Sequence, residues 1–352
     1  MKKLDKDKKF MLAIGIAALV IAVILIWQIT TSDNTKDVVG DNTTNSSVEI
    51  DTGGEDDDDS SEVKEYKLSP GVVIFDENTG TLHDDGFEFE IIEDAKTPQM
   101  KIVSYYDIER EKIELPSKVT YEDKEYTVTV IGNSAFESNT VMKEVVFSDS
   151  IKKVEDNAFY SCDTLEKVVF SDSVSKIGAG AFAECLSLKN IEFGKGLKSI
   201  GNEAFCDASS LTEISIPGSV ETMGKSIFYG CENMVKCTFE DGVSAVAAET
   251  FTNCYKLKEV ILPESIVSIG NEAFWSCEAL MELVIPSKVA LCGESAFYSS
   301  GITKLSIKST LLQPNAEMLE GCDTIKVILV PVDMADIYKD CYKDEEIQIK
   351  SL

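Results

Sequence analysis

The residues of this chain that could do chemistry are ten cysteines, one histidine and 62 acidic residues, out of 352 in all. Six of the cysteines recur at one position of an internal repeat: Cys162, Cys185, Cys231, Cys254, Cys277 and Cys322. No two cysteines have the C-x-x-C spacing that zinc sites and thiol redox centres favour. We therefore expect the recurring cysteines to pack as small apolar groups. Disulfides between cysteines of neighbouring repeats are the alternative, because parallel neighbours lie within bridging distance.

The single histidine, His83, excludes histidine-dependent catalytic triads and metal sites with several histidine ligands. Two carboxylates about 5 to 10 Å apart can catalyse glycoside hydrolysis, but among 62 acids such pairs are inevitable and identify no site. The sequence therefore predicts no catalytic residue, no metal site and no cofactor, and a carboxylate-dependent hydrolase is only the third functional hypothesis. The formal charge of −29 repels phosphate backbones, so we expect no binding to nucleic acid.

Side chains that could recognise a partner recur on the outward side of a predicted strand. Ile261 and Val284 occupy the same position in consecutive repeats, and the charged residues Glu259, Glu282 and Lys304 flank them. An apolar centre with a polar rim is typical of a protein interface. These five are the predicted partner-binding residues, and ordinary β propensity is the alternative explanation for the apolar pair.

Two further patterns accompany this patch. Trp275 and Tyr298 each follow a periodic phenylalanine, and their rings could either stack on a sugar or pack over the edge of the core. Charged residues at one strand position should form ion pairs between neighbouring repeats. The expected pairs are Glu144–Lys167, Glu213–Lys236, Lys236–Glu259 and Glu282–Lys304.

A repeat of 23 residues must position all of these side chains. Its markers are phenylalanines spaced 23 apart: Phe136, Phe159, Phe182, Phe205, Phe228, Phe251, Phe274 and Phe297. One residue is then dropped, and a ninth unit has Leu319 in place of the phenylalanine. A period of this length is typical of a solenoid, in which each repeat is one coil and identical residues form columns in the core.

Each unit combines a strand, a bend and a short turn. Glu213–Ile216 and Glu259–Leu262 alternate as short strands do, and a proline follows each. The segment Asn202–Phe205 reads as a single helical turn with Asn202 as its N-cap. We therefore predict an α/β repeat solenoid with short parallel strands and short helical turns.

The repeat pattern L-x-x-I-x-I-P-x-S-V-x-x-I-G-x-x-A-F-x-x-C resembles the BspA-like leucine-rich repeat family. Residues 211–220 and 257–274 carry it most clearly. The resemblance implies a leucine-rich repeat fold. It also implies a bacterial surface protein whose repeats serve adhesion or ligand binding. Glu155 and Ala247 replace the glycine of the pattern, and Cys292 replaces the isoleucine, which are local departures that do not affect the predicted fold.

The N-terminal part has the pattern of a membrane anchor followed by a stalk. Residues 10–29 are almost entirely apolar and long enough to cross a bilayer, and residues 1–9 carry five lysines. The lysine bias predicts a cytoplasmic N-terminus, a signal-anchor helix over 10–29 and an extracellular remainder. A cleavable signal peptide is the alternative, although no small-residue cleavage site follows. Residues 30–65 are polar and acidic, which predicts a disordered stalk.

The predicted solenoid, residues 113–330, needs both ends covered, because an open end would expose the core. Residues 66–112 contain alternating strand patterns at 86–91 and 100–103 and predict a β-rich N-terminal cap, and residues 331–352 predict a C-terminal cap. The favoured function is a binding or adhesion module at the plasma membrane for an extracellular protein or glycan. A structural envelope spacer without a dedicated ligand is the alternative.

Overall fold

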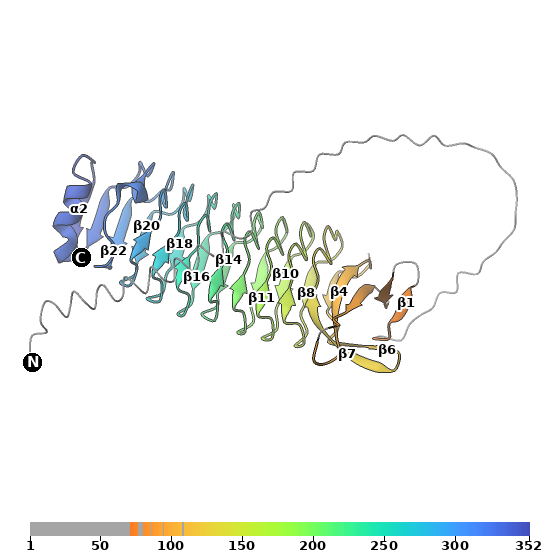
Figure 1. The fold of residues 1–352 in the computed structure, drawn as a ribbon. Coiled ribbons are helices and arrows are strands. Elements are labelled where there is room, and N and C mark those ends of the chain that lie inside the picture. The colour runs from red at the N-terminus through yellow and green to blue at the C-terminus, as the bar shows by residue number, and fades with distance from the viewer. Residues whose placement is uncertain (1–70, 77–79, 85, 94, 108) are drawn as a thin grey trace, which may run out of the picture. The chain divides into compact units, whose positions relative to one another are not determined.

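The computed structural model describes residues 71–352 except 77–79, 85, 94 and 108 (Figure 1). The predicted cytoplasmic segment 1–9, anchor helix 10–29 and stalk 30–65, and the first residues of the predicted N-terminal cap, lie outside this part of the chain. Within the described part, no helix combines the length and the apolar character that crossing a bilayer requires. The account below concerns the compact unit that begins at Glu65.

Successive coils stack in parallel, and each contributes a strand to one side of the stack (Figure 1). These strands are β5 (Lys112–Glu114), β8 (Glu144–Val146), β10 (Lys167–Val169), β12 (Asn190–Glu192), β14 (Glu213–Ile216), β16 (Lys236–Phe239), β18 (Glu259–Ile261), β20 (Glu282–Ile285), β22 (Lys304–Ile307), β23 (Val327–Val330) and β24 (Gln348–Ser351). All pairings among them are parallel. They form three sheets, β12-β10-β8-β5, β14-β16-β18 and β20-β22-β23-β24, so the hydrogen-bonded ladder is interrupted after β12 and after β18.

A second ladder of two-residue strands lies where the sequence predicts only a bend. Its members are β9 (Lys153–Val154), β11 (Lys176–Ile177), β13 (Ser199–Ile200), β15 (Thr222–Met223), β17 (Ala245–Val246), β19 (Ser268–Ile269) and β21 (Leu291–Cys292). Neighbouring members pair in parallel except between β15 and β17. Each strand precedes the glycine position of the repeat. A side chain at Gly270 would place its Cβ 2.4 Å from the Ala248 nitrogen, so glycine there permits the close approach of two coils.

The N-terminal strands extend the second ladder. They are β1 (Ile74–Asp76), β2 (Thr81–His83), β3 (Phe87–Ile91), β4 (Gln99–Tyr105), β6 (Lys118–Tyr121) and β7 (Lys124–Ile131). The first four pair antiparallel in sequence order, and β4 then pairs in parallel with β7, which joins β9. The unpaired edge of the first coil is therefore covered by strands of the same chain.

The C-terminal end contains the helices of the described residues. They are the 3-10 helices η1 (Ala316–Leu319) and η2 (Val332–Met334) and the α-helix α2 (Ala335–Cys341). Tyr338 of α2 is fully buried and donates its hydroxyl hydrogen to the Leu312 carbonyl at 3.1 Å. Tyr342 donates to the Asn315 carbonyl at 2.8 Å, so both tyrosines fasten this segment to the last coils.

The segment around each periodic phenylalanine is a turn, and the predicted helical turn is wrong. Residues two before and two after each phenylalanine have left-handed backbones, with φ between 50° and 70°. Their N–H groups donate to the next coil, as Glu203 does to the Lys225 carbonyl (2.9 Å) and Asp207 to the Tyr229 carbonyl (2.7 Å). Asn202 caps no helix, because its Oδ1 accepts the Lys225 N–H of the next coil at 3.0 Å. The fold is therefore a parallel β-solenoid with leucine-rich repeats, and the α/β class is corrected.

The phenylalanine column forms the centre of the core, as the period predicts. All eight rings are at most 1% exposed. Consecutive ring centroids lie 4.6–5.9 Å apart, with interplanar angles of 5–17°. The large aliphatic residues six positions later are buried as well, from Met142 to Leu280. Contacts between identical positions of neighbouring coils thus hold the stack together.

Candidate functional site

The outward side of the strands is the first candidate surface. Each strand alternates, so that Leu283 and Ile285 of β20 are buried while Glu282 and Val284 are exposed. The structure places Ile261 (41% exposed) and Val284 (46% exposed) at the same outward position of two successive coils. Val146 and Val169 occupy that position in earlier coils and are only partly exposed. The two most exposed apolar side chains of this column therefore lie on successive coils.

The interruption of the ladder falls at this patch. β18 and β20 contact each other, but no hydrogen-bonded pairing joins them in the part of the chain that the structure describes. Val260 and Leu262, which occupy inward positions of the coil, are only partly buried there. The sequence predicts two continuous neighbouring strands here, and the structure instead has a sheet boundary between them.

Ion pairs frame the patch on both sides. Lys236 Nζ lies 3.0 Å from Glu259 Oε2, and Lys304 Nζ lies 2.8 Å from Glu282 Oε2. These two predicted pairs are confirmed. All four side chains are at least one-third exposed, so each pair contributes little to stability and mainly fixes where the charges stand.

The other two predicted pairs are wrong. Lys167 forms its ion pair with Glu192, at 3.0 Å, although Glu144 lies opposite it in the strand register. Glu192 stands at the outward position two residues further along its strand, so the long lysine reaches diagonally across to the next coil. Glu213 forms no ion pair with Lys236 among the described residues, because the lysine reaches Glu259 instead.

Met281 belongs to the same surface and was missed by the sequence analysis. Its side chain is 53% exposed, and it directly precedes Glu282 of β20. Its carbonyl accepts the N–H groups of Thr303 and Lys304, so the backbone there is fixed by the next coil. The signal was present, because most coils have lysine, glutamate or threonine at this repeat position. We name Ile261, Met281 and Val284 the strand-face patch.

Trp275 and Tyr298 lie elsewhere on the coil and are occupied by each other. Their ring centroids are 4.1 Å apart with an interplanar angle of 20°. The backbone of Gly321 covers the ring of Tyr298, since a Cβ there would lie 2.2 Å from it. Thr252 holds the equivalent position in the coil before Trp275 and is buried. This arrangement matches packing over the core edge and leaves little ring face for a sugar.

The recurring cysteines are free thiols that pack in the core. The thiols of Cys162, Cys185, Cys231, Cys254 and Cys277 each donate to the carbonyl of a phenylalanine in the preceding coil, at 3.0–3.3 Å. Burial raises the pKa of the Cys231 and Cys254 thiols well above the ordinary value, which disfavours the reactive thiolate. No disulfide joins them in the structure, in agreement with the first of the two expectations.

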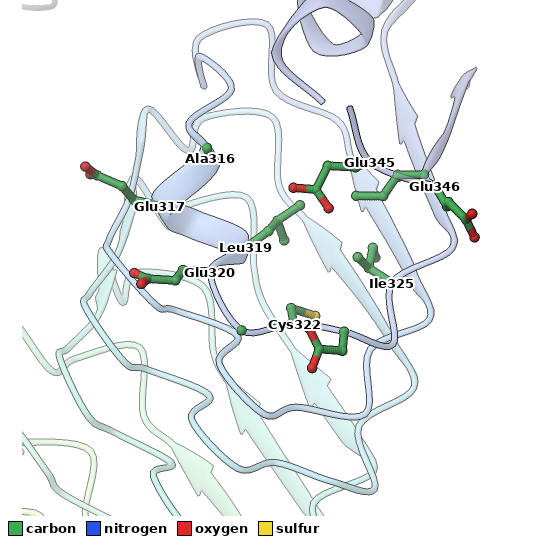
Figure 2. A pocket seen from close by; sticks show the side chains of 11 residues that line it. Ala316, Glu317, Leu319, Glu320, Cys322, Ile325, Glu345 and Glu346 are labelled. Carbon is green, nitrogen blue, oxygen red and sulfur yellow. The ribbon is translucent and has the colours of Figure 1, made fainter. Parts of the chain in front are cut away.

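Metal-binding and enclosed sites are sparse in the described residues. Across that part of the chain, no group of three or more histidine, cysteine, aspartate or glutamate side chains is placed to hold a metal ion. A cavity of about 690 Å³ lies at the C-terminal end of the stack, beside η1 and the residues that lead into β24 (Figure 2). Its walls come from two segments that are distant in sequence, 316–325 and 345–347.

Comparison with known proteins agrees with this architecture. A family described as the BspA type leucine-rich repeat region matches residues 103–235 and 221–349, with six copies of its repeat. The crystal structure of a leucine-rich repeat protein from T. pallidum is 21% identical, with a TM-score of 0.50, and the match covers 68% of this chain and 92% of that one. A leucine-rich cell surface protein from Faecalibacterium prausnitzii is 23% identical, with a TM-score of 0.49 and coverage of 77% and 76%. The first of these shows a shared fold. A comparison with curated proteins finds no significant match.

Proposed function

The chain belongs to the BspA-type leucine-rich repeat family, and we propose that it is a membrane-anchored binding or adhesion module whose strand face recognises an extracellular protein. The observation that carries the proposal is the strand-face patch. Three exposed apolar side chains, Ile261, Met281 and Val284, lie between two ion pairs on a rigid stack. Interfaces combine an apolar centre with a polar rim in this way, and a few central residues dominate their affinity.

A protein partner fits this surface better than a glycan does. Sugars are commonly held by exposed aromatic faces, and the candidates Trp275 and Tyr298 stack on each other instead. The patch itself consists of aliphatic side chains and a methionine, and methionine adapts to irregular apolar surfaces of a partner protein. The partner is therefore expected to present apolar side chains flanked by charges that complement Glu259 and Lys304.

Surface plasmon resonance with the purified chain tests the proposal against immobilised extracellular-matrix proteins, glycans and cell-wall polymers. The double substitution Ile261→Thr and Val284→Thr keeps the branched Cβ that suits a strand and adds hydroxyls to the patch. It should weaken binding to a protein ligand by more than about tenfold, because truncating interface hot spots typically costs more than 1.4 kcal/mol. The matched control is Val146→Thr and Val169→Thr, at the same position of earlier coils. Equal binding by both double variants would refute the assignment of the patch.

The membrane anchor is part of the same proposal and rests on sequence alone. Residues 10–29 would span the bilayer and residues 30–65 would form an exposed stalk. External protease on intact cells should then cut within 30–65 and release the repeats. Protection of the repeats in intact cells, with cleavage after lysis, would contradict this topology.

A structural spacer without a ligand is the second candidate, and the unbroken stack of rings from Phe136 to Phe297 favours it, since such a stack makes a stiff rod. A spacer predicts no saturable binding to any immobilised surface. It also predicts that changing the strand-face patch leaves cell attachment unaltered.

A further inference from the structure

The turn ladder of the solenoid ends at the ninth coil. In the eight preceding coils, the residue two after the periodic phenylalanine donates its N–H to a carbonyl of the next coil, from Ser138 to Tyr160 (2.8 Å) through Ser299 to Gly321 (2.9 Å). Gly321 holds this position in the ninth coil, with the same left-handed backbone (φ 66°). Its N–H has no hydrogen-bond acceptor among the described residues. One ladder donor is thus left where a tenth turn would begin.

The chain supplies only part of a tenth coil. β24 pairs in parallel with β23, in the position of a tenth strand. The chain reaches β24 through α2 and residues 345–347, and it forms no turn over η1. Between η1 and 345–347 lies the cavity of about 690 Å³, which is within the size range of ligand sites. The cavity therefore occupies the place of the missing turn.

The floor of the cavity is apolar. Leu319 and Ile325 hold the positions of the periodic phenylalanine and of the buried aliphatic in the ninth coil, and both line the cavity together with Ile347. In every earlier coil, residues at these two positions are covered by the same residues of the next coil. An apolar side chain from a ligand would find the environment that a tenth phenylalanine would have had.

The charge of the cavity has one sign. All ionisable carboxyl groups in its walls are acidic, and no lysine or arginine lines it. Figure 2 shows the Glu345 carboxylate directed toward Leu319 from the opposite wall. No ion pair joins Glu345 to a lysine or arginine of the described residues. A cation near Leu319 would therefore be attracted, and an anion would be repelled.

We propose that this cavity binds an extended segment of a basic polypeptide in place of the missing tenth turn. A backbone carbonyl of the segment accepts the Gly321 N–H, one apolar side chain packs on Leu319 and Ile325, and a lysine or arginine side chain faces Glu345. A second copy of this chain fits less well, because each copy carries a net charge of −29. A small cation alone would leave the apolar floor and the Gly321 donor unused. This site is separate from the strand-face patch, so either can fail without the other.

The test is fluorescence anisotropy of the full chain with a labelled synthetic peptide in which lysine alternates with phenylalanine and leucine, at about 0.15 M salt to screen non-specific attraction. A peptide with glutamate in place of each lysine should not bind. Glu345→Gln should weaken the basic peptide by about fivefold or more, which corresponds to the loss of one close charge pair. Glu232→Gln, an equal loss of charge at an exposed site in another coil, should change binding less than about twofold.

A second variant separates the cavity from its charge. Ala316→Trp leaves every charge in place and fills part of the cavity, so it should also weaken the peptide, with the fold verified by circular dichroism. Equal affinity in the original chain, the Glu345→Gln chain and the Ala316→Trp chain would show only a general attraction to the acidic surface and would overturn the proposal. Displacement of the peptide by spermidine at equal positive charge would show a site for cations alone, with the same consequence. A dimer in sedimentation velocity that Ala316→Trp abolishes would identify a second copy as the occupant and would also overturn it.

Discussion

Replacing Phe205 by alanine is the change that tests the core of the solenoid most sharply. The ring is fully buried, and it stacks between Phe182 at 5.5 Å and Phe228 at 5.8 Å. It also meets Phe193 edge-on, with centroids 5.8 Å apart and an interplanar angle of 74°. The substitution therefore removes one ring from the middle of a continuous column and leaves both stacked neighbours with one face uncovered.

The expected loss is about 4–5 kcal/mol of unfolding free energy. Returning a buried phenyl ring to water accounts for about 2–3 kcal/mol. The ring leaves a cavity on the order of 100 Å³, which at about 24 cal/mol per Å³ adds about 2 kcal/mol. The rings above and below are fixed by their own coils, so they cannot move far enough to close the gap.

Urea titration of the purified chain, followed by far-ultraviolet circular dichroism, measures this loss. Leu186→Ala is the control, because Leu186 is a large apolar residue near the same coils that is 46% exposed. It should cost less than about 1 kcal/mol. If Phe205→Ala costs no more than Leu186→Ala, contacts between identical residues do not hold the stack together and the reasoning fails.

Three further predictions concern single features of the fold. Gly301→Ala should destabilise the chain by about 2–3 kcal/mol in the same titration, because a Cβ there would lie 2.0 Å from the Glu278 carbonyl oxygen, and a loss below about 0.5 kcal/mol would contradict this close approach. Reductant should not shift the melting temperature, and in the native chain the exposed Cys341 should react with a thiol reagent before the buried cysteines do; a marked fall on reduction would point to disulfides. The hydrogen bond to Glu184 raises the pKa of Tyr160 to about 12, so this contact stabilises the fold fully below pH 10 and is lost as the pH rises toward 12. Glu184→Gln should lower the pH at which the Tyr160 phenol ionises, as read from absorbance near 295 nm, and an unchanged titration would refute the contact.

The stacking of the coils could be predicted because a period states it directly. Phenylalanines 23 residues apart can be buried together only if each repeat is one coil, and the register of β14, Glu213–Ile216, follows from its alternation. The helical turn could not be excluded in the same way. Asn202 and Glu203 favour a helix start locally, but their hydrogen bonds go to Lys225 of the next coil. A partner 23 residues away is invisible to local propensity.

The outward position of Ile261 and Val284 also follows from strand alternation. The boundary between β18 and β20 does not, because it depends on how two coils separate in space, and their strands have closely similar sequences. Met281 was missed because it stands beside the alternating stretch and not within it. The cavity beside η1 likewise depends on the path that residues 335–347 take after the ninth coil, which no repeat pattern specifies.

The central claim is that the strand-face patch contacts a protein partner. The most direct measurement places a photoreactive amino acid at Val284 in one chain and at Val146 in another, and crosslinks each to the partner identified by surface plasmon resonance. The account predicts a crosslinked complex from position 284, and little or none from position 146, which lies on the same side of the stack. Equal crosslinking from both positions, or crosslinking from position 146 alone, would contradict it.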